Sequence, residues 1–121
     1  MRINPDCVRI VLLTIENNLD FGKVMQLHEL MKFPLVLSFT RKDIEYSIHQ
    51  LTTEKMLDCK IYKYINGNCD YLIKDVTPEG HKLCDKIRNE TLWSKIKPHL
   101  EDVSSVAGII SVISSAASIF L

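Results

Sequence analysis

The chain has 121 residues, of which 46% are hydrophobic and 25% charged, so it suits one globular domain and is too apolar to be disordered throughout. Fifteen Lys and Arg residues balance fifteen Asp and Glu residues. A net charge of zero excludes attraction to a polyanion by bulk charge, so any nucleic-acid binding must come from a local patch.

The cysteines and the N-terminus indicate the compartment. Four cysteines without a CxxC pair do not form a disulfide framework (Cys7, Cys59, Cys69 and Cys84). The first residues also lack the clean apolar run of a signal peptide, because Arg9 interrupts it. We therefore expect a cytoplasmic protein with reduced thiols.

The N-terminal third predicts two helices and an extended segment. Asn4 is a good N-cap and Pro5 suits the first helical position of an amphipathic helix over residues 5–17. Its apolar stripe follows the spacing i, i+3, i+4, i+7 (Val8, Val11, Leu12 and Ile15). A second, short helix is predicted at about 23–32, and residues 35–37 are expected to be extended.

A third helix is predicted to begin after the cap Thr40 and to end near Lys55. Its buried stripe consists of Ile44, Ile48 and Leu51. At about 100° per residue, another set of side chains points in the opposite direction (Lys42, Tyr46, His49 and Thr53). This opposite face is expected to be exposed.

The clearest local signal is Asn66-Gly67 between two β-rich runs, 59–65 and 68–74, which predicts a hairpin with a type I′ turn. If these two residues form the loop, the facing pairs are Lys63 with Asp70, Tyr62 with Tyr71, and Ile61 with Leu72. One face of the hairpin then carries Tyr62, Tyr64, Cys69, Tyr71 and Ile73. The pattern leaves open which face belongs to the core.

The C-terminal part is predicted to be helical. Thr77-Pro78-Glu79 is a strong helix start, and Asn89-Glu90-Thr91 indicates a break and a new cap. Residues 103–121 contain no charge and suit one further helix. We therefore divide a single domain into residues 1–76, residues 77–102 and an apolar C-terminal helix at 103–121.

Three short helices followed by a two-stranded hairpin is the order of a winged helix-turn-helix, an α+β fold. Residues 76–83 resemble the start of the helix that follows the wing in winged-helix regulators. Residues 77–81 read T-P-E-G-H, and 85–95 read D-K-I-R-N-E-T-L-W-S-K. Together they resemble the bacterial and phage family called domain of unknown function 2513.

This family resemblance implies a winged-helix fold with additional C-terminal helices, and it implies no established activity. The segment Tyr46–Leu51 also resembles the family's third helix. Lys55 departs from the family pattern, because it stands where a glycine would close that helix in the left-handed region. The turn after the helix is then expected to be strained or differently shaped.

DNA binding is the first functional hypothesis, for a transcription regulator of phage or mobile-element type. Arg and Lys suit guanine and phosphate, Gln suits adenine, and Tyr and Thr reach phosphates. The predicted contacts lie on the third helix and the hairpin (Arg41, Lys42, Tyr46, His49, Gln50, Thr53, Lys60 and Lys63). This hypothesis depends mainly on analogy of fold.

The alternative is a non-enzymatic adaptor, like an antitoxin or an inhibitor, that binds another protein through the tyrosine-rich hairpin face. An enzyme is not expected, since the four histidines and four cysteines show no metal-binding spacing and no phosphate loop is present. We expect no catalytic residue, no metal and no cofactor.

The C-terminal helix carries a continuous apolar stripe that is too hydrophobic to face water (Val106, Ile109, Ile110, Ile113, Ala117 and Phe120). We expect this stripe to form a homodimer interface. Membrane association is the weaker alternative, because nineteen residues give a helix of about 28 Å and six of them are serines.

Overall fold

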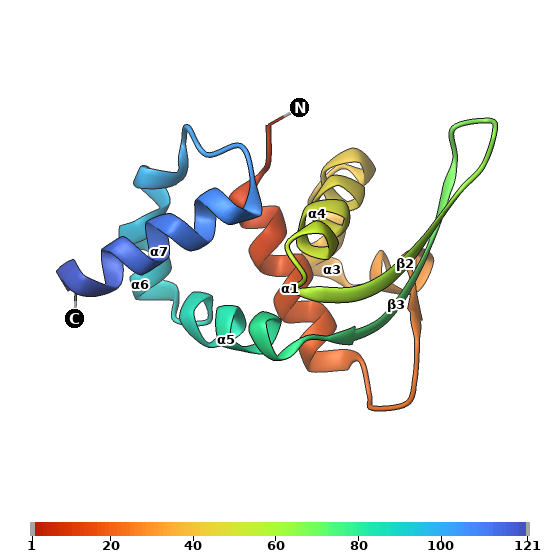
Figure 1. Cartoon of the computed structure of the whole chain (residues 1–121), viewed down its shortest axis with the longest axis horizontal. Helices are drawn as coiled ribbons and strands as arrows, with labels where there is room; N and C mark the ends of the chain where they lie inside the picture. The colour runs from red at the N-terminus through yellow and green to blue at the C-terminus, as the bar shows by residue number, and fades with distance from the viewer. Residues whose placement is uncertain (1, 121) are drawn as a thin grey trace.

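The helix α1 (Pro5–Asn18) lies in the middle of the computed structural model, which describes residues 2–120. The Asn4 side chain accepts a hydrogen bond from the Cys7 N–H at 3.2 Å, as its position predicts. The predicted stripe is buried, and α1 contacts both α4 and α5, which flank it in Figure 1. The first predicted helix is thus confirmed and forms the centre of the core.

The next segment differs from the prediction. In place of one helix at about 23–32, a strand β1 (Met25–Gln26) is followed by a helix α2 (Leu27–Leu30). The Gln26 N–H donates to the Glu29 carboxylate at 3.2 Å, which begins the helix only after the strand. Residues 35–37, expected to be extended, lie in the helix α3 (Pro34–Leu37), because Pro34 occupies its first position.

The fourth helix, α4 (Arg41–Thr53), is close to the predicted one. Thr40 Oγ1 accepts from the Asp43 N–H at 3.1 Å, and Ile44, Ile48 and Leu51 are fully buried. After α4 the backbone of Lys55 adopts φ +61°, so a residue other than glycine occupies the left-handed region. The turn is therefore strained, as the departure from the family pattern indicated.

The hairpin consists of β2 (Leu57–Lys63) and β3 (Cys69–Val76), and the antiparallel sheet has the order β1-β3-β2. The Tyr64 N–H donates to the Asn68 carbonyl at 2.9 Å, and the Gly67 N–H donates to the Tyr64 carbonyl at 3.0 Å. Three residues therefore form the loop, with Gly67 at φ +86°. The predicted two-residue type I′ turn is wrong.

The longer loop shifts the strand register by one residue. Tyr62 lies opposite Asp70, Ile61 opposite Tyr71, and Lys60 opposite Leu72. Such a shift moves every side chain of one strand to the other face of the sheet. Accordingly the buried Tyr71 shares the inner face with Cys69, Ile73 and Ile61, whereas the exposed Tyr62 and Tyr64 lie on the outer face.

Four further helical segments follow the sheet. They are α5 (Pro78–Ile87), α6 (Glu90–Ile96), the 3-10 turn η1 (Lys97–Leu100) and α7 (Val106–Phe120). The predicted break is confirmed, because the Asn89 side chain accepts from the Leu92 N–H at 3.0 Å and starts α6. In Figure 1, α6 and α7 lie at the end of the molecule opposite the hairpin loop.

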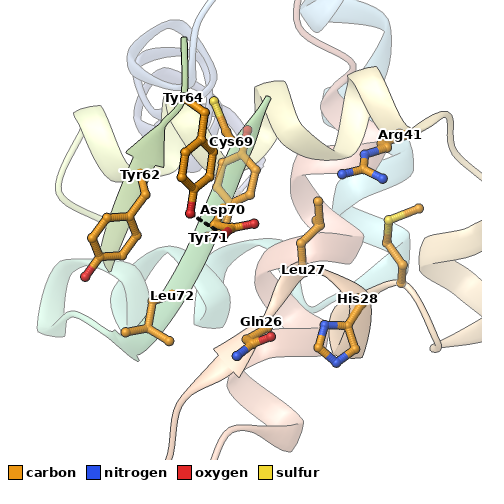
Figure 2. A pocket seen from close by; sticks show the side chains of 11 residues that line it. Gln26, Leu27, His28, Arg41, Tyr62, Tyr64, Cys69, Asp70, Tyr71 and Leu72 are labelled. Atoms are coloured by element: carbon orange, nitrogen blue, oxygen red, sulfur yellow. Dashed lines mark hydrogen bonds between the residues drawn. The ribbon is translucent and has the colours of Figure 1, made fainter. Parts of the chain in front are cut away.

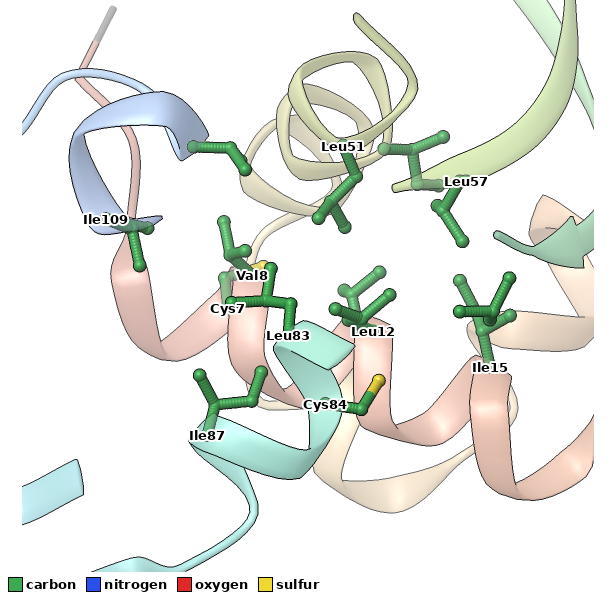
Figure 3. Packing of buried hydrophobic residues seen from close by; sticks show 14 of the residues in the cluster. Cys7, Val8, Leu12, Ile15, Leu51, Leu57, Leu83, Cys84, Ile87 and Ile109 are labelled. Carbon is green, nitrogen blue, oxygen red and sulfur yellow. The ribbon is translucent and has the colours of Figure 1, made fainter. Parts of the chain in front are cut away.

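The C-terminal stripe packs against its own chain. Val106, Ile109 and Ile113 are at most 2% exposed in the isolated chain, and Figure 3 shows Ile109 beside Val8 of α1 and near α5. These three side chains already have an intramolecular partner, while Ile110 is half-buried. The side chains of Ala117 and Phe120 lie outside the part that the structure describes. Within residues 2–120 no helix has the length and hydropathy needed to cross a membrane.

Candidate nucleic-acid interface

The non-core side of α4 carries six of the eight predicted contact residues. Arg41, Lys42 and Thr53 are exposed, whereas Tyr46, His49 and Gln50 are half-buried. Tyr46, His49 and Gln50 are half-buried because the hairpin, which follows α4 directly, packs beside this helix. The structure therefore brings the predicted helix residues together on one side but leaves them unequally accessible.

His49 is bonded to the hairpin and does not project into solvent. Its Nε2 atom lies 2.9 Å from the Tyr71 hydroxyl, and the two rings meet edge to face with centroids 5.4 Å apart at 89°. Burial lowers the pKa of His49 below its ordinary value of 6.5, and the Lys63 ammonium lowers it further, against the opposing effect of Glu45. His49 thus connects α4 to β3.

Other polar side chains of α4 also bond within the helix. The Gln50 amide donates to the Tyr46 hydroxyl at 3.2 Å, and the Thr53 hydroxyl donates to the His49 carbonyl at 2.9 Å. Arg41 Nε lies 3.6 Å from the Glu45 carboxylate, both partners being solvent-accessible. Such exposed pairs contribute little to stability, so Arg41 is available to an incoming anion.

The two predicted hairpin lysines lie on different faces. Lys63 lies opposite Cys69 on the inner face and is close enough to α4 to influence His49. Lys60 lies opposite Leu72 on the outer face, with its Nζ 5.4 Å from the centre of the Tyr62 ring. The structure therefore joins Lys63, and not Lys60, to the polar side of α4.

A groove that the sequence did not reveal lies between the hairpin and α2. It has a volume of about 390 Å³ (Figure 2), and Gln26 and His28 are among its lining residues. Tyr64 donates a hydrogen bond to the Asp70 carboxylate at 2.7 Å, which raises the pKa of the Tyr64 hydroxyl. The groove depends on β1 and α2, whose boundaries were mispredicted, so the sequence offered no signal for it.

The residues that carry the family resemblance hold the C-terminal helices to α1. The Glu16 carboxylate accepts hydrogen bonds from His81 at 2.8 Å and from Arg88. Burial opposes the charged form of Glu16, but these two partners outweigh it and hold the pKa of Glu16 below its ordinary value. This contact joins α5 to α1.

A second contact joins α6 to the start of α1. Trp93 Nε1 donates to the Asp6 carboxylate at 3.0 Å, and Lys97 Nζ lies 2.6 Å from the same group. Burial again opposes ionisation, yet both partners keep the pKa of Asp6 low. His81 and Trp93, two residues of the motif, therefore join α5 and α6 to α1.

The described residues offer little for metal or thiol chemistry. Between residues 2 and 120 no three His, Cys, Asp or Glu side chains are close enough together to hold a metal ion. The four cysteines are free thiols, and burial raises the pKa of Cys7 and of Cys59 to about 11. These two thiols are therefore protonated, and weak nucleophiles, at neutral pH.

A family model and a distant relative both match this chain. The model of a family described as "Hypothetical protein (DUF2513)" matches residues 2–107, so all of α7 after its second residue lies outside the match. An uncharacterized protein of Haemophilus influenzae is 25% identical over 105 residues, which cover 86% of this chain and 82% of that protein. No solved structure matches the chain.

Proposed function

The chain belongs to the DUF2513 family, and we propose that it is a winged-helix protein that binds double-stranded DNA through α4 and the β2–β3 hairpin. The order of elements supports this proposal, because a strand and two short helices precede α4 and a hairpin follows it. In winged-helix domains the helix before the hairpin enters the major groove, and the hairpin contacts the backbone beside it. The phage-type regulator suggested by the family resemblance is the corresponding biological role.

The contact between α4 and the hairpin is the observation that carries the proposal. The His49–Tyr71 hydrogen bond holds the two elements together, with Lys42 exposed on one and Lys63 on the other. We assign phosphate contacts to Arg41, Lys42 and Lys63, and base contacts to Tyr46 and Gln50. His49 is assigned a structural role, because it bonds to the hairpin, and Lys60 is assigned no DNA contact.

Salt dependence is the test of this proposal. Lys42→Ala is expected to weaken binding to a pool of genomic DNA fragments and to reduce the slope of log affinity against log salt by about 0.9. Lys95→Ala removes an exposed lysine from α6 and is the matched control. Fluorescence anisotropy across several salt concentrations measures both effects. Absence of salt-sensitive binding, or equal losses in both variants, contradicts the proposal.

Protein binding remains the second candidate, and exposed apolar side chains favour it. Leu35 and Leu37 on α3 are 65% and 57% exposed, and Ile65 at the hairpin loop is fully exposed. Exposed apolar groups of this size are typical of contact surfaces. A pull-down from the native host with and without nuclease separates the candidates, because DNA-dependent capture favours the first and one nuclease-resistant protein favours the second.

A homodimer and a cytoplasmic location complete the proposal. Two copies would read two half-sites about one helical turn apart on DNA. Since Val106, Ile109 and Ile113 are buried within their own chain, a dimer must use other residues of α7, such as the half-buried Ile110, or another surface. Sedimentation velocity over a range of concentrations tests this directly.

A further inference from the structure

Strand β1 covers only part of the edge of β3. Its two residues pair with Leu72 and Ile73, and at Leu27 the chain turns into α2. Strand β3 continues beyond this point to Cys69 and the hairpin loop. The segment of β3 nearest the loop therefore has a strand neighbour, β2, on one side only.

The backbone groups of that segment alternate in direction. Because the Tyr64 N–H donates to the Asn68 carbonyl, Asn68 points its backbone groups at β2, and so does every second residue after it in a regular ladder. Cys69 and Tyr71 consequently direct theirs to the opposite side, where the pairing of Gln26 with Leu72 already sets Leu27 against Tyr71 and leaves Cys69 uncovered. That side is the one on which β1 pairs with Ile73.

The groove follows this uncovered edge. Its volume of about 390 Å³ adjoins a second hollow of about 340 Å³, and the two share Arg41, Cys69, Asp70 and Tyr71. Between them they are lined by every residue from Gly67 to Leu72. A hollow on one face of a strand touches alternate residues, so contact with consecutive residues means that this groove runs along the backbone edge.

The charges of the groove favour a basic occupant. Its lining includes two carboxylates, Asp70 and Glu45, and one guanidinium, Arg41, which is paired with Glu45. The Tyr64 ring lies near Asp70 in Figure 2, where it offers a face for a cationic side chain, whereas the Tyr62 ring already has Lys60 Nζ 5.4 Å from its centre. A phosphate backbone would meet the two carboxylates and gain little.

We propose that this groove binds an extended basic peptide, which adds to the edge of β3 as a strand in line with β1. The backbone groups of Cys69 pair with the peptide, and a Lys or Arg side chain of the peptide reaches Asp70. The site is separate from the polar side of α4 that the DNA proposal uses, apart from Arg41, which borders both. With this site the protein binds a polypeptide partner in addition to DNA.

A random twelve-residue peptide library displayed on phage, selected against the full chain, is the probe. Enriched peptides are expected to carry Lys or Arg, and Asp70→Asn is expected to weaken their binding by up to about fivefold, as loss of an exposed ion pair does. Lys74→Gln, on the same strand outside the groove, is the matched control. Selection of peptides that Asp70→Asn does not affect overturns the proposal.

Backbone pairing gives the second, independent readout. In the synthetic form of a selected peptide, N-methylation of the one residue that pairs with Cys69 is expected to weaken binding about tenfold, whereas N-methylation of either neighbouring residue is expected to leave it unchanged, because the N–H groups next to it point away from β3. In the protein, Cys69→Pro removes a donor that faces the groove, whereas Cys69→Ala retains it.

The two cysteine variants separate strand addition from side-chain binding. Loss of peptide binding in Cys69→Pro but not in Cys69→Ala, with unchanged circular dichroism, supports strand addition. If Cys69→Pro unfolds the chain, the N-methyl pattern alone decides. The proposal is overturned if N-methylation weakens binding equally at neighbouring residues. It is also overturned if double-stranded DNA displaces the peptide from the Arg41→Ala variant at low salt.

Discussion

His49 of α4 and Tyr71 of β3 share a hydrogen bond of 2.9 Å between Nε2 and the phenol oxygen, and their rings meet edge to face. The bond joins the two elements that we propose to bind DNA. Tyr71→Phe is expected to lower the free energy of unfolding by about 1 kcal/mol, because one partly buried bond is lost and the ring remains. Denaturant unfolding measures the loss, and Tyr62→Phe, at an exposed tyrosine, is the control.

The same histidine predicts a pH dependence of stability. Burial and Lys63 lower the pKa of His49 in the folded state below the ordinary 6.5 of the unfolded state. The unfolded chain therefore binds a proton more readily at this residue, and folding loses stability as the pH falls below 6.5. His49→Gln is expected to flatten the dependence of the unfolding midpoint on pH between 7 and 5, as measured by thermal melting at several pH values.

Gly80 allows α5 to lie against the turn after α4. A Cβ atom at this position would lie 2.1 Å from the Met56 carbonyl oxygen, which is backbone and unable to rotate away. Gly80→Ala is therefore expected to destabilise the fold by about 1–3 kcal/mol. At Gly108 the nearest atom is a Val103 methyl group at 2.7 Å, and Gly108→Ala is expected to cost less. Equal effects of the two substitutions on thermal melting would contradict this explanation.

Lys55 pays a conformational cost at φ +61° that glycine would avoid. Lys55→Gly is therefore expected to raise the free energy of unfolding by about 1 kcal/mol. Glu54→Gly, one residue earlier at φ −84°, is expected to give no such gain. A melting temperature that falls in both variants would mean that the Lys55 side chain makes contacts worth more than the strain.

Ile109 connects α7 to the rest of the core. The side chain is 1% exposed, so Ile109→Ala is expected to destabilise the fold by about 2–5 kcal/mol, whereas Ser111→Ala on the exposed side of α7 is expected to be neutral. If the loss in Ile109→Ala depends on protein concentration, a dimer contributes to the stability. A loss independent of concentration assigns the contribution to packing within one chain.

Local signals were reliable where their partners lie within a few residues. The caps Asn4, Thr40, Thr77 and Asn89 all accept the backbone hydrogen bonds that their positions predict, because each bond spans only three residues. The apolar stripes of α1 and α4 are likewise buried as expected. Such features follow from helix geometry and need no knowledge of the rest of the fold.

The sequence by itself thus determined an α+β chain with a hairpin at Asn66-Gly67 and capped amphipathic helices. Only the tertiary structure decided the rest. Asn66-Gly67 predicted a loop of two residues, but the structure has a loop of three, with Tyr71 buried beside His49. Strand β1 exists because Ile73, far along the chain, supplies its partner. The apolar stripe of α7 is recognisable in the sequence, but the residues against which it packs are not. Apolar burial is non-directional, so the stripe does not indicate its packing partner.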